Sequence, residues 1–271
     1  MRRPDRAFLV MFAGALLLAA CSKSPTLKSP KIRGSEQIAP TYRFEDDAAT
    51  RRRVEVREML GIAAQRLSIG DLAEAEKQAR GALRRDPAAA DGHTLLAVIA
   101  DRRGDSEQAG AHYRQAAELG PSRGDLLNNY GAWLCGNGYP AEALVWFDRA
   151  LAMPDYPSPA SALANAGGCA VRSGQHERAE RDLRRALELD PGNAYALASM
   201  AELSYGAGQL MQARAFAQRR LAAAPADASV LQLAVKIEQG LGDRVAASRY
   251  HQRLREEFPQ AVLVKSGEDP G

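Results

Sequence analysis

The sequence predicts an all-α fold built from six repeats of two helices each. The 271-residue chain contains 52 alanines, the residue with the highest helix propensity, and only 6% aromatic residues, which disfavours a β-sandwich or barrel. Prolines recur at intervals of 34 residues, and glycine and alanine recur with the same period. A period of this length indicates a stack of small two-helix units rather than one central core.

The prolines set the boundaries of the repeats. Proline occurs at positions 87, 121, 191, 225 and 259, and every interval is 34 residues except one of 70, which holds two periods and a two-residue insertion near 153–157. With each proline at position 32 of its unit, the repeats begin near residues 56, 90, 124, 160, 194 and 228. Proline suits the junction between units because it needs no amide hydrogen there.

Glycine and alanine mark inner points of each repeat. Position 15 is always glycine, whose access to the left-handed conformation would end the first helix. Position 20 is always alanine, which lets the two helices approach closely. The glycines are Gly70, Gly104, Gly138, Gly174, Gly208 and Gly242, and the alanines are Ala75, Ala109, Ala143, Ala179, Ala213 and Ala247.

This helix–turn–helix pattern resembles the tetratricopeptide repeat (TPR) over residues 56–261. The resemblance implies a right-handed superhelix, or α-solenoid, in which the first helix of each repeat lines a concave face. Neighbouring repeats would stabilise one another. We therefore expect a protein that binds a peptide, helix or strand of another protein in the concave groove.

The N-terminus predicts a lipoprotein signal peptide over residues 1–20. Three arginines among the first six residues precede an uncharged run over 7–20, which is shorter than the roughly 20 residues that span a bilayer. The run ends in LAAC, which resembles the lipobox of bacterial lipoproteins and implies that Cys21 is lipidated. Serine at position 22 implies delivery to the outer membrane, on its periplasmic face. The alternative is a buried helix or a membrane anchor.

The segment after the signal is predicted to be a flexible tether over residues 21–47. It contains Pro25, Pro30 and Pro40 among polar residues, and no apolar period. The TPR domain is expected to occupy residues 48–261, with its first helix beginning within 48–55. Residues 262–271 are expected to form a disordered tail.

No residue pattern predicts catalysis, a cofactor or a metal ion. The histidines His93, His112, His176 and His251 fall at different repeat positions, and none has the spacing of zinc ligands. No phosphate-binding loop or nucleophile elbow follows a strand. The 36 basic and 33 acidic residues are too balanced to indicate nucleic-acid binding, and aromatic residues are not interleaved with the arginine pairs. We expect a non-enzymatic protein.

Two cysteines remain once Cys21 is assigned to the lipid. Cys135 and Cys169 fall at positions 12 and 10 of the third and fourth repeats, near the ends of first helices that pack side by side in a TPR stack. In an oxidising compartment we expect them to form a disulfide. Two buried free thiols are the alternative.

Two sequence stretches are more specific than the general TPR pattern. The third repeat contains NNYGAWLC over residues 128–135, and the fourth contains NAGGCA over 165–170. Together with the lipobox and the six repeats, they resemble the PilF/PilW family of type IV pilus biogenesis lipoproteins. This resemblance implies a pilotin, an adaptor that assists the outer-membrane localisation and multimer assembly of the pilus secretin. A TPR lipoprotein that regulates peptidoglycan hydrolases or synthases is the competing hypothesis.

The first helices supply the candidate groove residues, because positions 2, 5, 9 and 12 of a TPR face the concave side. The apolar groups in the first repeat suggest that a hydrophobic partner segment binds there, unless residues 22–55 cover them. The candidates in this repeat are Arg57, Leu60, Ala64 and Leu67.

Further groove candidates come from the third, fourth and fifth repeats. They are Asn128, Asn129, Asn165, Tyr195 and Tyr205. The side chains of Asn129 and Asn165 could bond an extended backbone of the partner, or form local structural bonds. We expect the protein to act as a monomer whose partners are secretin subunits.

Overall fold

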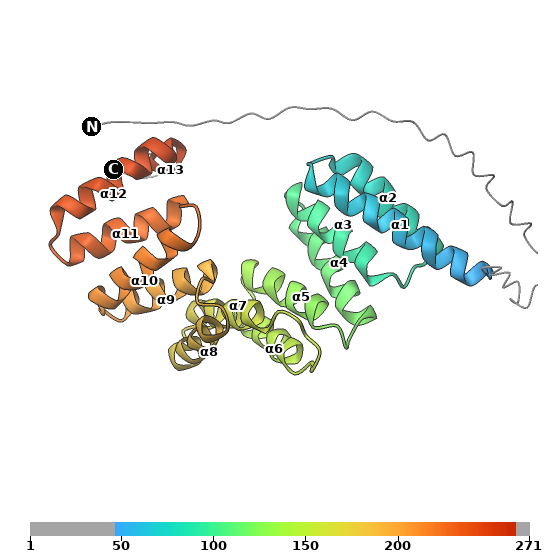
Figure 1. The fold of residues 1–271 in the computed structure, drawn as a ribbon, viewed down its shortest axis with the longest axis horizontal. Coiled ribbons are helices and arrows are strands. Elements are labelled where there is room, and N and C mark those ends of the chain that lie inside the picture. The colour runs from blue at the N-terminus through green and yellow to red at the C-terminus, as the bar shows by residue number, and fades with distance from the viewer. Residues whose placement is uncertain (1–46, 264–271) are drawn as a thin grey trace, which may run out of the picture. The chain divides into compact units, whose positions relative to one another are not determined.

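In the computed structural model, which describes residues 47–263, all regular secondary structure is helical (Figure 1). The helices are α1 (Ala48–Ser68), α2 (Leu72–Arg85), α3 (Ala90–Arg102), α4 (Ser106–Leu119), α5 (Gly124–Gly136), α6 (Pro140–Leu151), α7 (Pro159–Arg172), α8 (His176–Leu189), α9 (Ala194–Gly206), α10 (Leu210–Ala223), α11 (Ala228–Gly240), α12 (Arg244–Glu257) and α13 (Pro259–Leu263).

The first twelve helices form six antiparallel hairpins, and each hairpin packs against the next one (Figure 1). The first helices α3, α5, α9 and α11 begin at residues 90, 124, 194 and 228, and α7 begins at residue 159. α13 follows the last hairpin and packs on α12. The prediction of an all-α TPR superhelix is therefore confirmed.

The turn inside each hairpin contains a glycine with the same backbone conformation in all six repeats. The glycine at position 15 has a positive φ, between 73° and 89°, which a side chain would strain. After α1, the amide of Asp71 donates to the carbonyl of Arg66 and closes the helix end, while the Asp71 carboxylate accepts from the amide of Glu74 and begins α2. Asp105 and Asp243 cap α4 and α12 in the same way.

The core lies within and between the hairpins, where small residues let the helices approach closely. The six alanines at position 20 are all buried. The largest cluster lies mainly in repeats three and four and includes the fully buried ring of Phe147. That ring packs against the backbone at Gly131, where a Cβ atom would lie 2.8 Å from it. The aromatic ring of Trp146 stands edge-on to Tyr130 in the same cluster.

The two-residue insertion between α6 and α7 also has a packing role. Its Tyr156 ring folds back onto the first residue of α5, Gly124, where a Cβ atom would lie 2.7 Å from the ring. Met153 packs against the central cluster. The insertion therefore covers the start of the third repeat without breaking the stack.

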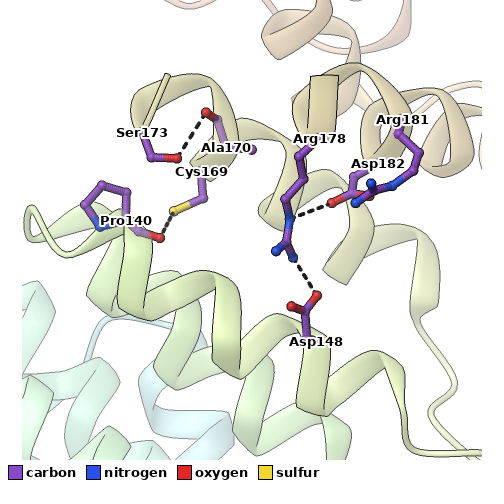
Figure 2. A network of polar contacts seen from close by, with 8 residues as sticks. All are labelled: Pro140, Asp148, Cys169, Ala170, Ser173, Arg178, Arg181 and Asp182. Carbon is purple, nitrogen blue, oxygen red and sulfur yellow. Dashed lines mark hydrogen bonds and ion pairs between the residues drawn. The ribbon is translucent and has the colours of Figure 1, made fainter. Parts of the chain in front are cut away.

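Ion pairs join repeats three and four across their second helices, as Figure 2 shows. Arg178 on α8 lies 2.5 Å from the carboxylate of Asp148 on α6, and 3.2 Å from that of Asp182. Asp182 is buried and also accepts from Arg181. A buried carboxylate retained in this way is stabilised by its two guanidinium partners.

The predicted signal peptide, the lipidation site Cys21 and almost all of the tether lie outside the described residues. At the other end, regular structure reaches Leu263, two residues beyond the predicted domain boundary, and residues 264–271 lie outside. Within residues 47–263, none of the helices combines the length and the apolar character that crossing a membrane requires.

Candidate protein-binding groove

Three of the four groove residues predicted in the first repeat come together. Arg57, Leu60 and Ala64 lie on one face of α1 and line a groove of about 630 Å³ between α1 and α3. The groove has an apolar wall, to which Leu95 of α3 contributes, and a polar rim. Its complete lining is Arg53, Val56, Arg57, Leu60, Gly61, Ala64, Asp86, Ala89, Asp91, Thr94 and Leu95. We call it the first groove.

Leu67 does not line the first groove, which corrects the prediction. It follows Ala63 by four residues and therefore shares the helix face that packs into the core. Its side chain is 7% exposed and belongs to a cluster with Leu96 and Ile99 of α3. The candidate partner surface of repeat one therefore includes Leu60 and Ala64 but not Leu67.

The rim of the first groove carries charges of both signs. Arg53 and Arg57 lie on the α1 side, and Asp86 and Asp91 on the other side. Asp91 is paired with Arg123, at 2.8 Å, from the loop before α5. Hydrogen bonds from Arg123 to Asp125 and Asp91 raise the pKa of its guanidinium, so it stays cationic. A bound segment would therefore contact an apolar wall that lies between basic side chains on one side and acidic side chains on the other.

The three asparagine candidates occupy two different places. Asn165 of α7 donates its side-chain amide to the Asn128 side-chain carbonyl of α5, at 3.0 Å, so this pair joins the third and fourth repeats. This contact is the local structural bond that was the alternative to partner binding. Asn129 lines a separate hollow between the second and third repeats.

The two tyrosine candidates differ in exposure. Tyr195 of α9 is 40% exposed and lies over Gly168 of α7, where a Cβ atom would be 2.5 Å from its hydroxyl oxygen. That hydroxyl accepts from Arg172, at 2.9 Å, and Arg172 also donates to the carbonyl of Cys135. Tyr205 is half-buried against the core of repeats five and six. Neither tyrosine reaches the first groove.

Cys135 and Cys169 form a disulfide in the structure, with their Cα atoms 5.9 Å apart. Both side chains are buried, and the bond ties the end of α5 to α7. Figure 2 shows the Cys169 sulfur beside the carbonyl oxygen of Pro140, at 3.5 Å. The disulfide therefore links the first helices of the third and fourth repeats.

One pair of polar residues was not anticipated from the sequence. His93 and His112 are 19 residues apart, but the second hairpin brings their Nδ1 atoms to 3.2 Å. Burial lowers the pKa of both imidazoles, and for His112 the neighbouring His93 adds to the effect. Over residues 47–263, no group of three or more His, Cys, Asp or Glu side chains could hold a metal ion.

The arrangement is suited to binding a polypeptide segment. The first groove is open, its apolar wall can bury side chains, and its charged rim can orient them. The lining therefore supports recognition of a polypeptide segment.

Comparison with protein families matches the tetratricopeptide repeat to most of the described region. One TPR family model matches residues 59–124 and 135–194, and a second one matches residues 170–237. A curated protein of Haemophilus influenzae, described as uncharacterized, is 29% identical over 98 residues, or 36% of this chain. The chain spans about half of that relative, 55% of its length.

Solved structures give a closer match. PilW, described as a widely conserved type IV pilus biogenesis factor, is 31% identical, and the alignment covers 76% of this chain and 94% of PilW with a TM-score of 0.69. PilF of Pseudomonas aeruginosa is 23% identical with a TM-score of 0.68, covering 80% of this chain and 99% of PilF, which shows the shared fold. Since the chain spans nearly all of PilW at this identity, it belongs to the PilF/PilW family of TPR proteins.

Proposed function

We propose that the protein is a pilotin, an outer-membrane lipoprotein that binds pilus secretin subunits and promotes their localisation and multimer assembly. The observation that carries the proposal is the match to PilW, a type IV pilus biogenesis factor, over nearly all of its length. The open groove of repeats one and two supplies a surface for the secretin. The lipobox at Cys21 supplies the anchor.

In this proposal the first groove holds an apolar segment of a secretin subunit. Leu60 is half-buried, which leaves part of its side chain available to a partner, and Ala64 is exposed beside it. Burying such a surface would give the favourable free energy, and the rim charges would fix the register. The protein contributes binding and delivery, and it acts without catalysis.

The groove is tested by a charge placed on its apolar wall. Leu60→Glu should reduce secretin multimers severalfold in cells, because a buried carboxylate opposite an apolar segment is unfavourable. Ile62→Glu is the matched control: it makes a comparable apolar-to-acidic change on the same helix, at a side chain that is 41% exposed and lies outside the groove. Equal multimer levels in both variants, with unchanged helical content, would remove the first groove from the proposed function.

The anchor is tested separately at Cys21. Cys21→Ser should move the protein from the outer-membrane fraction to the soluble periplasmic fraction, since no acyl chains can be attached. Membrane fractionation with antibody detection measures this directly. An unchanged outer-membrane fraction would contradict the lipid anchor while leaving the groove proposal intact.

A further inference from the structure

A second hollow lies between repeats two and three. Its volume is about 350 Å³, and its lining includes Asp101 at the end of α3, Tyr113 of α4, and Asn129 and Trp133 of α5. α3 and α5 make little direct contact, less than α1 makes with α3 or α7 with α9. The hollow therefore reaches the second-helix layer at Tyr113. We call it the aromatic pocket.

Asp101 holds an unusual place within the repeat pattern. It occupies position 12, where Leu67 and Cys135 are buried in the stack, yet Asp101 is exposed. No ion pair involves its carboxylate within residues 47–263. The two arginines that follow it are engaged elsewhere, because Arg102 donates to the carbonyl of Leu67 and Arg103 pairs with Glu76.

Asp101 is surrounded by aromatic side chains and is partly shielded from solvent. Loss of solvent raises the pKa of its carboxyl group, and the Tyr113 hydroxyl beside it offsets part of that shift. The carboxylate is thus a negative charge without a positive partner, placed beside two aromatic side chains that line the same hollow. A cation bound there would gain both an ion pair and a contact with a ring face.

The indole of Trp133 forms one wall of the pocket. It is packed against Gly110 of α4, and its Nε1–H is buried and has no acceptor among the described residues. Because that nitrogen is out of reach of a ligand, the indole contributes apolar surface to the pocket rather than a hydrogen bond. Asn129, on the same helix, likewise makes no side-chain hydrogen bond within the described part of the chain.

We propose that the aromatic pocket binds a lysine or arginine side chain of the segment held in the first groove. The cationic head pairs with the Asp101 carboxylate, and the aliphatic stem lies along Tyr113 and Trp133. This inference rests on the proposed function only in that the concave face must hold a protein segment.

The distance between the two sites predicts how far apart the apolar and basic residues of the bound segment lie in its sequence. Asp91 lines the first groove and Asp101 lines the aromatic pocket, ten residues apart on α3. A helix rises 1.5 Å per residue, so the sites are separated by roughly 15 Å. An extended segment covers about 3.3 Å per residue, which places the basic residue about five positions from the part of the segment that lies in the first groove beside Asp91.

Selection of random 12-residue peptides against the full chain tests this motif without assuming a partner. Wild-type protein should enrich peptides in which an apolar run is followed or preceded by lysine or arginine about five positions away. Asp101→Lys should lose that enrichment and weaken the selected peptides at least tenfold, whereas Asp155→Lys, an equal charge change in the exposed loop before α7, should not. Basic residues enriched equally by wild type and Asp101→Lys, or not enriched at all, would overturn the inference.

The same variants separate this inference from the proposed function. If the periplasmic part of the cognate secretin binds the wild type, Asp101→Lys should weaken that binding at least tenfold, and a Lys→Glu or Arg→Glu change in the bound segment should restore it. Binding that is unaffected by Asp101→Lys contradicts the aromatic pocket. A secretin that binds no form of the protein contradicts the proposed function, and the peptide selection still decides the pocket.

Discussion

At the scale of single residues, the packing between helices depends on glycines at positions where any side chain would clash with a neighbouring aromatic ring. Gly110, Gly131 and Gly168 each face a ring of the neighbouring helix, contributed by Trp133, Phe147 and Tyr195 respectively. In each case the large aromatic residue fills the space that the glycine leaves, which fixes the distance between two helices. These contacts depend on the three-dimensional pairing of helices, so the sequence pattern alone does not identify them.

Gly110→Ala should destabilise the protein by about 1–3 kcal/mol, because the added methyl group would overlap the Trp133 indole ring between repeats two and three. Gly61→Ala is the matched control, since a Cβ atom at Gly61 meets nothing within 4 Å and alanine is the better helix former. Chemical denaturation of both variants measures the free energies of unfolding. Equal stability of the two would contradict the packing described at Gly110.

The His93–His112 pair predicts a pH dependence of stability. Burial lowers both pKa values below the ordinary value of 6.5, so the folded protein binds fewer protons than the unfolded chain as the pH falls past that value. The stabilisation is fully present above pH 6.5 and is lost progressively below it. The melting temperature should therefore be lower at pH 5.5 than at pH 7.5.

His112→Gln should reduce this difference in melting temperature, because one of the two titrating groups is then absent. His251→Gln, at an exposed position, should leave it unchanged. Thermal unfolding followed by circular dichroism at the two pH values is sufficient. A His112→Gln variant with the full wild-type difference would assign the pH dependence to other groups.

At the scale of helices and turns, the sequence predicted most of what the structure contains. A glycine that must adopt a positive φ and an alanine at a close helix contact are local requirements, and they recur at positions 15 and 20 of every repeat. The side chain at position 12 was less predictable. Leu67 and Cys135 are buried at this position while Asp101 is exposed, so the repeat position alone does not decide the burial of this side chain.

The link between α5 and α7 gives a prediction at this scale. Cys135 and Cys169 are 34 residues apart in sequence, so their disulfide should stabilise the fold by about 3–4 kcal/mol in the loop-entropy estimate. Cys135→Ala with Cys169→Ala should lower the free energy of unfolding by that order. Alkylation of the unfolded, non-reduced protein should find neither thiol free, and two free thiols would falsify the disulfide.

At the scale of the whole described domain, function follows from stacking rather than from any single repeat. The first groove needs α1 and α3, and the aromatic pocket needs α3, α4 and α5, so each site is created where two repeats meet. The sequence predicted the concave face and part of the first groove. It could not predict the aromatic pocket, since a spacing pattern does not report how closely α3 and α5 approach each other.

The central claim is that the concave face of repeats one and two binds the pilus secretin. Affinity purification of the full-length protein from its own cells, with the recovered partners identified by mass spectrometry, tests it most directly. The account predicts that the secretin is recovered with the wild type and with Ile62→Glu, and that it is lost with Leu60→Glu. Recovery of peptidoglycan hydrolases or synthases, with the secretin absent from every sample, would contradict it.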